Sequence, residues 1–506
     1  MSNDTPDDSF FGRSDILPPT KSVQRRINLP RIKREVKYLH HMIWINEAYL
    51  LMLQEQGIIS ENDAKLIAQA LEKLMKERLS VLKIDLPLDD LYIHIEKFLI
   101  EEIGPEIGGK LHVGRSRWDL YATFHRMIIR DKINVLTTHL LDLQNTLIEL
   151  ALFHSNTIIV IYTHFQHAQP TTFGHYLLAI VDSLFRDLER IEMAYKHTNL
   201  CPLGGSIATS SFPINRVKTC KLLGFDDIIE NSYDAATATD YLIETVWCLC
   251  SIIANLNKLI NDIHLWQGQD INLIKVAGQY ATSSSMMPQK RNPIVLENIR
   301  ARGIRIYGNL ISILCMLKNL NSPCRDEREV IPLVFDSFKA CNDVIIILDE
   351  IMKTLEVNSL KGIELARDGF STMSQLAEYI VRFSDIKSFR VAHKIVGRIV
   401  STALERKMKP SEITSRIVDE VSEKIVGKRL GLKEDIIKKA LDPKQFVLSR
   451  KVKGGPSPKE VQRMVRERKE LLKNWGKKLM DRKGRLKKAY VELRNIIKKW
   501  TTLYDN

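Results

Sequence analysis

Long apolar runs are missing from this 506-residue sequence. No stretch of about 18 or more uncharged apolar residues occurs, so we expect no membrane-spanning segment. The beginning, MSNDTPDDSFFGRSD, is polar and acidic, whereas a secretory signal starts with basic residues and continues with apolar ones. Both absences favour a location in the cytoplasm.

Cysteine is also sparse, and its spacing is irregular. An odd number of cysteines over so long a chain provides no disulfide framework. Cys248 and Cys250 form a Cys-x-Cys pair, but no second pair of Cys or His follows at metal-ligand spacing. We therefore expect reduced, structural cysteines that hold no metal. The cysteines are Cys201, Cys220, Cys248, Cys250, Cys315, Cys324 and Cys341.

Acidic residues are few near the C-terminal end. Between Lys459 and Lys499, 16 Lys and Arg stand against 5 Asp and Glu, which is a local charge of +11 out of the net +14. A basic helix of this kind can bind nucleic acid or an acidic partner. No recognisable nucleic-acid-binding module accompanies it, so we expect a solvated helical tail, with such a partner as the weaker alternative.

Helical periodicity, in contrast, is abundant. Three segments carry apolar residues at alternating spacings of four and three, the 3.5-residue period of helices that pack nearly parallel along continuous seams. Alternation of the strand type is scarce. The sequence therefore predicts an all-α protein built around a bundle of long helices. The seams are Ile129, Ile133, Leu136, Leu140, Leu143, Leu147 and Leu150; Leu177, Val181, Leu184, Leu188 and Ile191; and Leu242, Val246, Leu249, Ile253, Leu256, Ile260 and Ile263.

Breaks in these patterns divide the chain. Gly and Pro cluster at 104–109, a second break lies near Asn358–Gly369, and GGPSP occupies 454–458. We expect a smaller helical domain on either side of the bundle. The predicted ranges are 1–115 for an N-terminal helical domain, 116–365 for the bundle, 366–474 for a C-terminal helical domain and 475–506 for the basic helical tail.

Four polar segments interrupt the helical patterns. In a protein of long helices, irregular polar segments gather at helix ends, where substrates bind. We therefore expect the functional residues to lie in these segments. They are GGKLHVGRSRWD (108–119), YTHFQHAQPTTFGH (162–175), GGSIATSS (204–211) and ATSSSMMPQKRNPIVLE (281–297).

The polar segments carry complementary chemistry. Arg115, Arg117 and Lys290 are cations suited to carboxylates, and His164 can carry a proton near neutral pH. Each of these side chains also has an ordinary structural explanation when it is taken alone. Together they indicate an anion-binding cleft in a helical bundle.

One polar segment leads directly into an apolar helix. Asn292 and Pro293 suit the N-cap and the first position of that helix, with Glu297 in its first turns. A helix starting there presents backbone N–H groups towards the serine-rich segment before it, an arrangement that favours anions.

Taken together, the segments resemble those of the argininosuccinate lyase family, a branch of the fumarase/aspartase superfamily. The signature loop of that family reads G-S-S-x-M-P-x-K-x-N-P, and residues 283–293 read SSSMMPQKRNP, with only the leading glycine changed. GKLHVGRSR, YTHFQHAQPTTFGH, PLGGSIATSSFPINR, NSYDAATATD, VAHKIVGRIV and GGPSP are also similar, in the same order. The likeness runs from about residue 10 to about residue 470.

The resemblance implies an L-aspartase/fumarase-like fold and a homotetramer of three-domain subunits, in which each active site gathers loops of three subunits. It implies a reversible β-elimination in which a C–N bond of an N-substituted succinate breaks and fumarate leaves; argininosuccinate would give arginine. It also implies that neither a metal nor an organic cofactor takes part.

By the same resemblance, Ser284 abstracts the Cβ proton of the substrate. A serine hydroxyl is a poor base unless its alkoxide is stabilised, which a helix N-terminus and Lys290 could do. His164 matches the second acid/base, and Glu297 matches the carboxylate that orients it. The loop that carries Ser284 is expected to close over substrate and exclude water. The positions that match substrate-binding residues are Ser116, Arg117, Thr163, Gln169, Lys290 and Asn292.

Some positions depart from the family pattern, mostly where the leaving group is recognised. A site that hydrogen-bonds a polar group loses orders of magnitude in rate when those partners vanish. Alternatives therefore stay open: a paralogue that cleaves a different N-substituted succinate, or a non-catalytic structural or binding protein on the same scaffold. The departures are Tyr92 for histidine, Trp118 for asparagine, Thr239 for arginine, Leu320 for tyrosine and Arg325 for glutamine.

Overall fold

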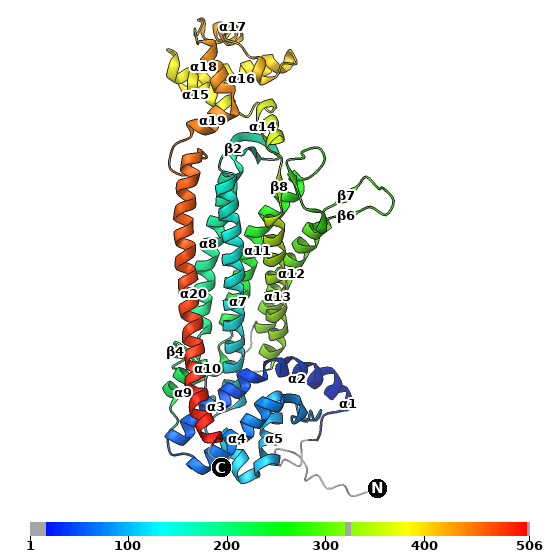
Figure 1. Ribbon diagram of the computed structural model, residues 1–506, viewed down its shortest axis with the longest axis vertical. Helices are drawn as coiled ribbons and strands as arrows, with labels where there is room; N and C mark the ends of the chain where they lie inside the picture. The colour runs from blue at the N-terminus through cyan, green and yellow to red at the C-terminus, as the bar shows by residue number, and fades with distance from the viewer. Residues whose placement is uncertain (1–16, 319–324, 503–506) are drawn as a thin grey trace.

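The protein is an elongated assembly of helices. The computed structural model describes residues 17–318 and 325–502. Long, nearly parallel helices form the middle of the molecule, a cluster of N-terminal helices lies at one end, and a group of shorter helices lies at the other (Figure 1). Helices predominate among the described residues, as the periodicity predicts.

The N-terminal cluster packs around its own apolar core, to which residues from Leu39 to Leu53 on one helix contribute the largest share. The helix that follows is capped by Ser60, whose hydroxyl accepts a hydrogen bond from the N–H of Asp63 at 3.1 Å. The elements are α1 (Lys21–Val23), a π-helical turn (Gln24–Asn28), α2 (Leu29–Glu35), α3 (Leu39–Glu55), α4 (Glu61–Glu77), α5 (Leu91–Ile103) and α6 (Pro105–Gly108).

Five long helices form the bundle. α7 packs against α8 and α13, α8 packs against α11, and α12 packs against α11 and α13. The predicted seams face one another, because all their residues are buried in one cluster except Leu150, which packs against that cluster. The prediction of a long-helix bundle is thus confirmed. The five are α7 (Arg117–Phe153), α8 (Phe173–Thr198), α11 (Asp240–Trp266), α12 (Ile294–Leu317) and α13 (Asp326–Lys353).

Short strands and helices connect the long ones. The strands pair into four two-stranded sheets, of which β1–β2, β5–β8 and β6–β7 are antiparallel and β3–β4 is parallel. The connecting elements are β1 (Ile158–Thr163), β2 (Gln166–Thr172), β3 (Leu200–Cys201), α9 (Arg216–Leu222), β4 (Asp227–Ile228), α10 (Ser232–Thr237), β5 (Ile274–Lys275), β6 (Thr282–Ser283), β7 (Arg291–Asn292) and β8 (Glu356–Val357).

The far end of the molecule carries shorter helices. Apart from α14 and α19, which pack on the β1–β2 hairpin, they surround a separate apolar core in which Leu376, Ile395 and Ile437 are fully buried. These helices are α14 (Ser359–Asp368), α15 (Met373–Phe383), α16 (Phe389–Glu405), α17 (Ser415–Val426), α18 (Glu434–Leu441) and α19 (Pro443–Ser449).

The last helix, α20 (Pro458–Thr501), is not the solvated tail that its charge suggests. It runs back along α7 and reaches α3 and α4 at the N-terminal end (Figure 1). Leu493 and Ile497 are fully buried there, and Arg494 pairs with Glu47 and Glu72. Burial of this inner face explains the difference, because a helix can be packed on one side and basic on the other. The helix continues without interruption through residue 474, and the predicted domain ranges stay predictions.

One helix of the bundle, α11, is long and apolar enough by composition to cross a membrane. It lies between α8, α12 and α13, and more than half of its most apolar window is buried against them. Its hydrophobicity is accounted for by the bundle core, and location in the cytoplasm stays a prediction.

Candidate active site

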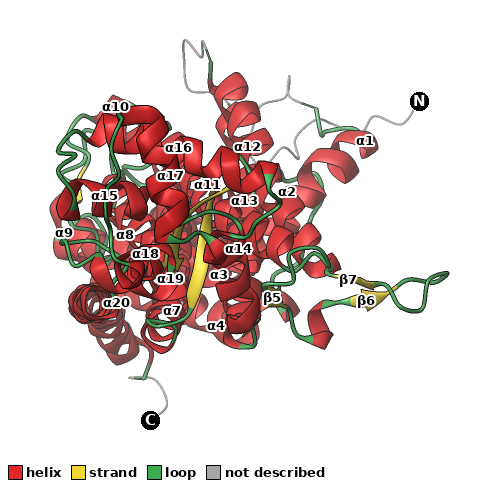
Figure 2. Cartoon of the chain, turned by 90° about the horizontal axis from the view of Figure 1, so that it is seen from above, coloured by secondary structure: helices red, strands yellow, loops and turns green. Residues whose placement is uncertain are grey.

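Ser284 lies on a hairpin that projects from the bundle. β6 and β7 pair Thr282 with Asn292 and Ser283 with Arg291, which leaves residues 284–290 as the connecting loop. Figure 2 shows this hairpin extending away from the body of the molecule. The predicted base therefore sits on an exposed arm.

Within this loop, the hydroxyl of Ser284 is held by backbone donors. Its Oγ accepts hydrogen bonds from the N–H of Met286 at 3.3 Å and from the N–H of Met287 at 3.0 Å. The N–H of Ser284 itself donates to the carbonyl of Lys290 at 3.2 Å. Two N–H groups directed at one oxygen stabilise negative charge on it, so the loop itself supplies part of what a serine base needs.

The helix after the hairpin begins one residue later than the sequence suggests. α12 starts at Ile294, and its N-cap is Pro293, which has no side-chain cap. Asn292 is not the N-cap, because its backbone pairs with Thr282 across the hairpin and stays extended. The prediction of an Asn292 cap is therefore wrong.

Glu297, in the first turn of α12, contacts a histidine other than the predicted one. Its Oε1 lies 3.9 Å from Nε2 of His264 on α11. Arg300 Nη1 lies 3.2 Å from Nδ1 of the same ring. Burial, and after it Arg300, lowers the pKa of His264, against the opposing effect of Glu297.

His164 lies at the tip of the β1–β2 hairpin. The pair Thr163–Gln166 closes a two-residue turn in which His164 has φ 53° and Phe165 has φ 57°. Positive φ at both positions is the type I′ geometry that Asn-Gly usually occupies, so two residues with bulky rings place strain here. Both rings are exposed as a result.

The other residues predicted on this hairpin lie close to His164 along the strands. Thr163 is exposed, and Gln169 Nε2 donates to Ser374 Oγ at the start of α15 at 3.0 Å. His167, in contrast, turns back and places its Nε2 3.1 Å from the hydroxyl of Tyr162. His164 and Thr163 therefore lie on the outer side of the hairpin and point away from the rest of their own chain.

Ser116 and Arg117 lie at the opposite end of α7. The hydroxyl of Ser116 accepts from the N–H of Trp118 at 3.3 Å, and the N–H of Ser116 donates to Asp119 Oδ1 at 2.8 Å. Asp119 is fully buried, and its Oδ2 also accepts from the N–H of Gly204, whose φ is +80°. This capping box joins the GRSR and GGS segments, two of the four polar segments in the sequence.

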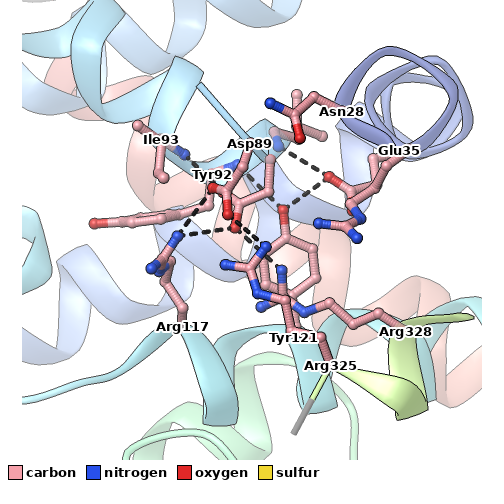
Figure 3. A network of polar contacts seen from close by, with 12 residues as sticks. Asn28, Glu35, Asp89, Tyr92, Ile93, Arg117, Tyr121, Arg325 and Arg328 are labelled. Atoms are coloured by element: carbon pink, nitrogen blue, oxygen red, sulfur yellow. Dashed lines mark hydrogen bonds and ion pairs between the residues drawn. The ribbon is translucent and has the colours of Figure 1, made fainter. Parts of the chain in front are cut away.

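Arg117 belongs to a network of charges that Figure 3 shows from close by. Its Nη1 lies 3.1 Å from Asp89 Oδ1 and 3.3 Å from Asp90 Oδ2. Asp90 is fully buried and also binds Nη1 of Arg328 at 3.1 Å, while Asp89 pairs with Arg325. Burial acts to raise the pKa of Asp89, but Arg325 and Arg117 outweigh it and hold that pKa below its usual value.

A protonatable carboxyl borders the same network. Glu35 Oε2 accepts from the N–H of Leu91 at 2.9 Å and from the hydroxyl of Tyr121 at 2.8 Å. Burial, and after it the neighbouring Asp90, raises the pKa of Glu35 from 4.5 to about 7. The guanidinium of Arg328 lies over the Tyr121 ring at 4.0 Å. In this network the charges of the arginines and of the carboxylates therefore compensate one another away from solvent.

Another arginine of the GRSR segment is more deeply buried. Arg115 donates from Nη2 to Asn46 Oδ1 at 2.7 Å and lies over the Tyr49 ring at 4.8 Å. Its Nε and Nη1 are buried without a hydrogen-bond partner among the described residues. An unpaired buried donor is costly, so this side of Arg115 is suited to an anion.

The residues that depart from the family pattern gather at this end of the bundle. The hydroxyl of Tyr92 lies 2.6 Å from His112 Nδ1, and Trp118 is half-buried in the first turn of α7. Thr239 is the N-cap of α11. The positive charge of Arg325, expected to face a leaving group, is matched by Asp89. Leu320 lies outside the described residues.

The predicted site residues thus form two groups that one chain keeps apart. α7 has 37 residues, about 55 Å at 1.5 Å per residue, and separates Ser116 and Arg117 from the hairpin with Thr163, His164 and Gln169. Ser284, Lys290, Asn292 and Glu297 lie at the same end as that hairpin (Figure 1). No cluster of three or more His, Cys, Asp or Glu suited to a metal occurs within residues 17–318 and 325–502.

Sequence reasoning missed Asp90, Arg328 and Glu35. Adjacent acids before an apolar helix are an N-cap signal, and Asp90 does cap α5 through the N–H of Ile93 at 3.2 Å. That signal could have drawn attention to Asp90. Arg328 and Glu35 carry no local signal, because their partners lie far away in the sequence.

Comparison with known proteins identifies the family that the chain resembles. Residues 24–308 match the family model described as lyase, and residues 370–448 match the model of the argininosuccinate lyase C-terminal region. The chain is 39% identical to argininosuccinate lyase of Methanocaldococcus jannaschii over 444 residues, which are 87% of this chain and 90% of the relative. It is 35% identical to argininosuccinate lyase 1 of Shouchella clausii over 464 residues, 91% of this chain and 93% of the relative.

Solved structures show the same fold. EDDS lyase in complex with formate superposes with a TM-score of 0.85 at 29% identity, covering 95% of both chains. Class II fumarase of Schistosoma mansoni has a TM-score of 0.69 at 16% identity, with 84% of this chain and 92% of the fumarase covered, which bears on the fold alone. On the extent of these matches, the chain belongs to the argininosuccinate lyase family, carbon–nitrogen lyases of the fumarase/aspartase superfamily that release fumarate.

Proposed function

We propose that the protein cleaves argininosuccinate into arginine and fumarate, in a homotetramer whose active sites combine loops of different subunits. The observation that carries the assembly is the separation of the two groups of site residues by the length of α7. A second copy that runs antiparallel beside the first would bring its Ser116 end to the hairpin end of its neighbour.

An unpartnered apolar face supports such an assembly. Ile304, Ile311 and Leu314 on α12 are about half exposed, and their spacing of seven and three places them on one side of the helix. Trp247 on α11 is exposed to a similar extent. Apolar side chains of this size along a bundle are typical of surfaces that other subunits cover.

In the proposed reaction, Ser284 removes a proton from Cβ of the succinate part. The electron pair of that C–H bond forms the double bond of fumarate as the C–N bond breaks, and the amine takes up a proton as it leaves. The N–H groups of Met286 and Met287 would stabilise the Ser284 alkoxide. Burial in a closed site would strengthen these interactions.

The remaining predicted residues take the other roles. His164 is the second acid/base and Glu297 orients it from another subunit, since within one chain Glu297 contacts His264 instead. Ser116, Thr163, Lys290 and Asn292 bind the fumarate part as hydrogen-bond donors and, for Lys290, as a cation. Arg117 and Gln169 complete the proposed substrate-binding set.

The substrate is tested by following fumarate formation through its ultraviolet absorbance. Argininosuccinate and a panel of other N-substituted succinates, including ones with acidic amines, are compared under the same conditions. We expect argininosuccinate to be turned over at an ordinary enzymatic rate, on the order of 1–10³ s⁻¹. Faster cleavage of another member of the panel would contradict the assignment, and no fumarate from any of them would indicate a non-catalytic protein.

A further inference from the structure

A groove lies between α8 and α20, and none of the predicted site residues lines it. Its volume is about 320 Å³, within the size range of small-molecule sites. One wall comes from the C-terminal half of α8 and the other from the middle of α20, and Asp226 also lines the groove. The lining residues are Glu192, Tyr195, Lys196, Asp226, Asn474, Lys477, Lys478, Asp481, Arg482 and Arg485.

The floor of the groove is a buried ion pair. Both oxygens of Glu192 are engaged, one by Lys478 Nζ at 3.0 Å and the other by Arg482 Nη1 at 3.1 Å. Arg482 is 4% exposed and lies over the Tyr195 ring at 3.9 Å. Its Nε is buried and has no hydrogen-bond partner among the described residues, which leaves a donor unsatisfied at the floor.

Cations are in excess around this floor. Five Lys and Arg side chains line the groove against three carboxylates. Lys196, Lys477 and Arg485 form no hydrogen bond or ion pair with their side chains in the described part of the chain, and all three are exposed. The excess of two positive charges matches one dianionic group. The carboxylates of Asp226 and Asp481 in the same groove disfavour a long polyanion over a compact one.

Part of the groove lies outside the residues that the family models match. The family models match residues 24–308 and 370–448, and α20 begins at Pro458. Four of the five lining cations lie on α20. No predicted catalytic or substrate-binding residue contributes to it.

We propose that this groove binds a phosphate group, either as a free anion or carried by a small phosphate ester such as a nucleotide. Phosphate presents several acceptor oxygens and two charges, which suits a guanidinium and ammonium groups that converge from two helices. Because the ligand joins α8 to α20, its binding stabilises the packing of the last helix on the bundle.

The proposal is tested by titrating the full-length protein with pyrophosphate in a calorimeter, in a phosphate-free buffer of low ionic strength. The Lys477→Ala/Arg485→Ala variant removes two unpaired cations of the groove. The matched control, Lys487→Ala/Lys498→Ala, removes two exposed cations of the same helix that do not line the groove. We expect the first variant to bind at least about tenfold more weakly and the control to stay within about twofold of the natural protein.

Further titrations distinguish the sources of the phosphate. Tighter binding of ATP than of pyrophosphate would support the proposal with a nucleotide as ligand, and the reverse order would support a free anion. Fumarate formation should be unchanged in both variants. The proposal is overturned if millimolar pyrophosphate does not bind, if both variants lose affinity equally, if fumarate displaces pyrophosphate, or if only a long single-stranded oligonucleotide binds.

Discussion

The carboxylate of Asp90 lies 3.1 Å from the guanidinium of Arg328, although 238 positions separate them in the sequence. Both side chains are buried, and Asp90 also binds Arg117. This contact ties the start of α5 to α13 and to the first turn of α7. The end of the bundle that carries Ser116 and Arg117 is therefore held by charges that compensate one another.

Asp90→Asn should destabilise the protein. The amide keeps an oxygen for the N–H of Ile93, but Arg328 and Arg117 lose their shared counter-charge. Breaking a buried ion pair by removing one partner costs about 3–5 kcal/mol, which urea unfolding measures. Asp85→Asn is the control, because its pair with Lys97 is partly exposed and worth at most about 1 kcal/mol. Equal losses of unfolding free energy in the two variants would show that the buried ion pair contributes no more to stability than the partly exposed one.

The pH dependence of stability should report Glu35. Its pKa is raised from 4.5 to about 7, so between these values the folded state holds a proton that the unfolded state has released. The contribution of Glu35 to the free energy of unfolding is therefore fully present below about pH 4.5. It is lost as the pH rises through about 7, and the loss is on the order of 3 kcal/mol. In the Glu35→Gln variant, the part of the decline in unfolding free energy between pH 5 and 8 that comes from Glu35 should vanish. An unchanged pH profile in the variant would mean that Glu35 titrates normally.

Variants of the projecting loop test the proposed chemistry. Ser284→Ala should abolish fumarate formation while substrate still binds, since the cations remain. His164→Asn and Glu297→Gln should each lower kcat by about 10²–10⁴-fold, the usual scale of a positioned acid or base. Steady-state kinetics and equilibrium binding of substrate measure these effects. Ser284→Ala activity near that of the natural protein would remove Ser284 from the mechanism.

Mixed tetramers test whether a site combines subunits. Ser284→Ala and Arg117→Gln alter opposite ends of the bundle, and each alone should be inactive or nearly so. If a site takes these residues from different subunits, random mixing leaves about one site in four intact, so activity should return on co-refolding to roughly a quarter. Mixing Ser284→Ala with Lys290→Ala, two residues of the same loop, is the control and should restore nothing. Failure of the first mixture to regain activity would contradict a site that combines Ser284 of one subunit with Arg117 of another.

The bundle could be predicted because its seams repeat. Residues such as Leu136, Leu140 and Leu143 recur every 3.5 positions, and that local pattern alone requires buried, nearly parallel helices. The Ser284 loop could be found because a signature of adjacent residues carries it. Contacts between residues that are far apart in the sequence, such as that of Asp90 with Arg328, could not be predicted from a local pattern.

The separation of the site residues could be predicted only in part. The seam from Ile129 to Leu150 indicates a long helix between Ser116 and His164, but it does not give the full 37 residues of α7. In α20 the high density of Lys and Arg masked an apolar spacing at Leu479, Leu493 and Ile497, all of which are buried. Composition averages over all faces of a helix, whereas packing depends on one face alone.

The packing of α20 leads to the last prediction. Leu493 is fully buried among the N-terminal helices, whereas Val491, two positions earlier on the same helix, is 43% exposed. Leu493→Ala should lower the free energy of unfolding by about 2–5 kcal/mol, because it removes buried methyl groups and leaves a cavity. Val491→Ala should change it by less than about 0.5 kcal/mol, since alanine also favours the helix. Denaturant unfolding of both variants, with fumarate formation as a check of the folded state, measures the difference. If the two substitutions are equally mild, the end of α20 is the solvated tail that its charge suggests, and the contacts of Arg494 with Glu47 and Glu72 do not hold it in place.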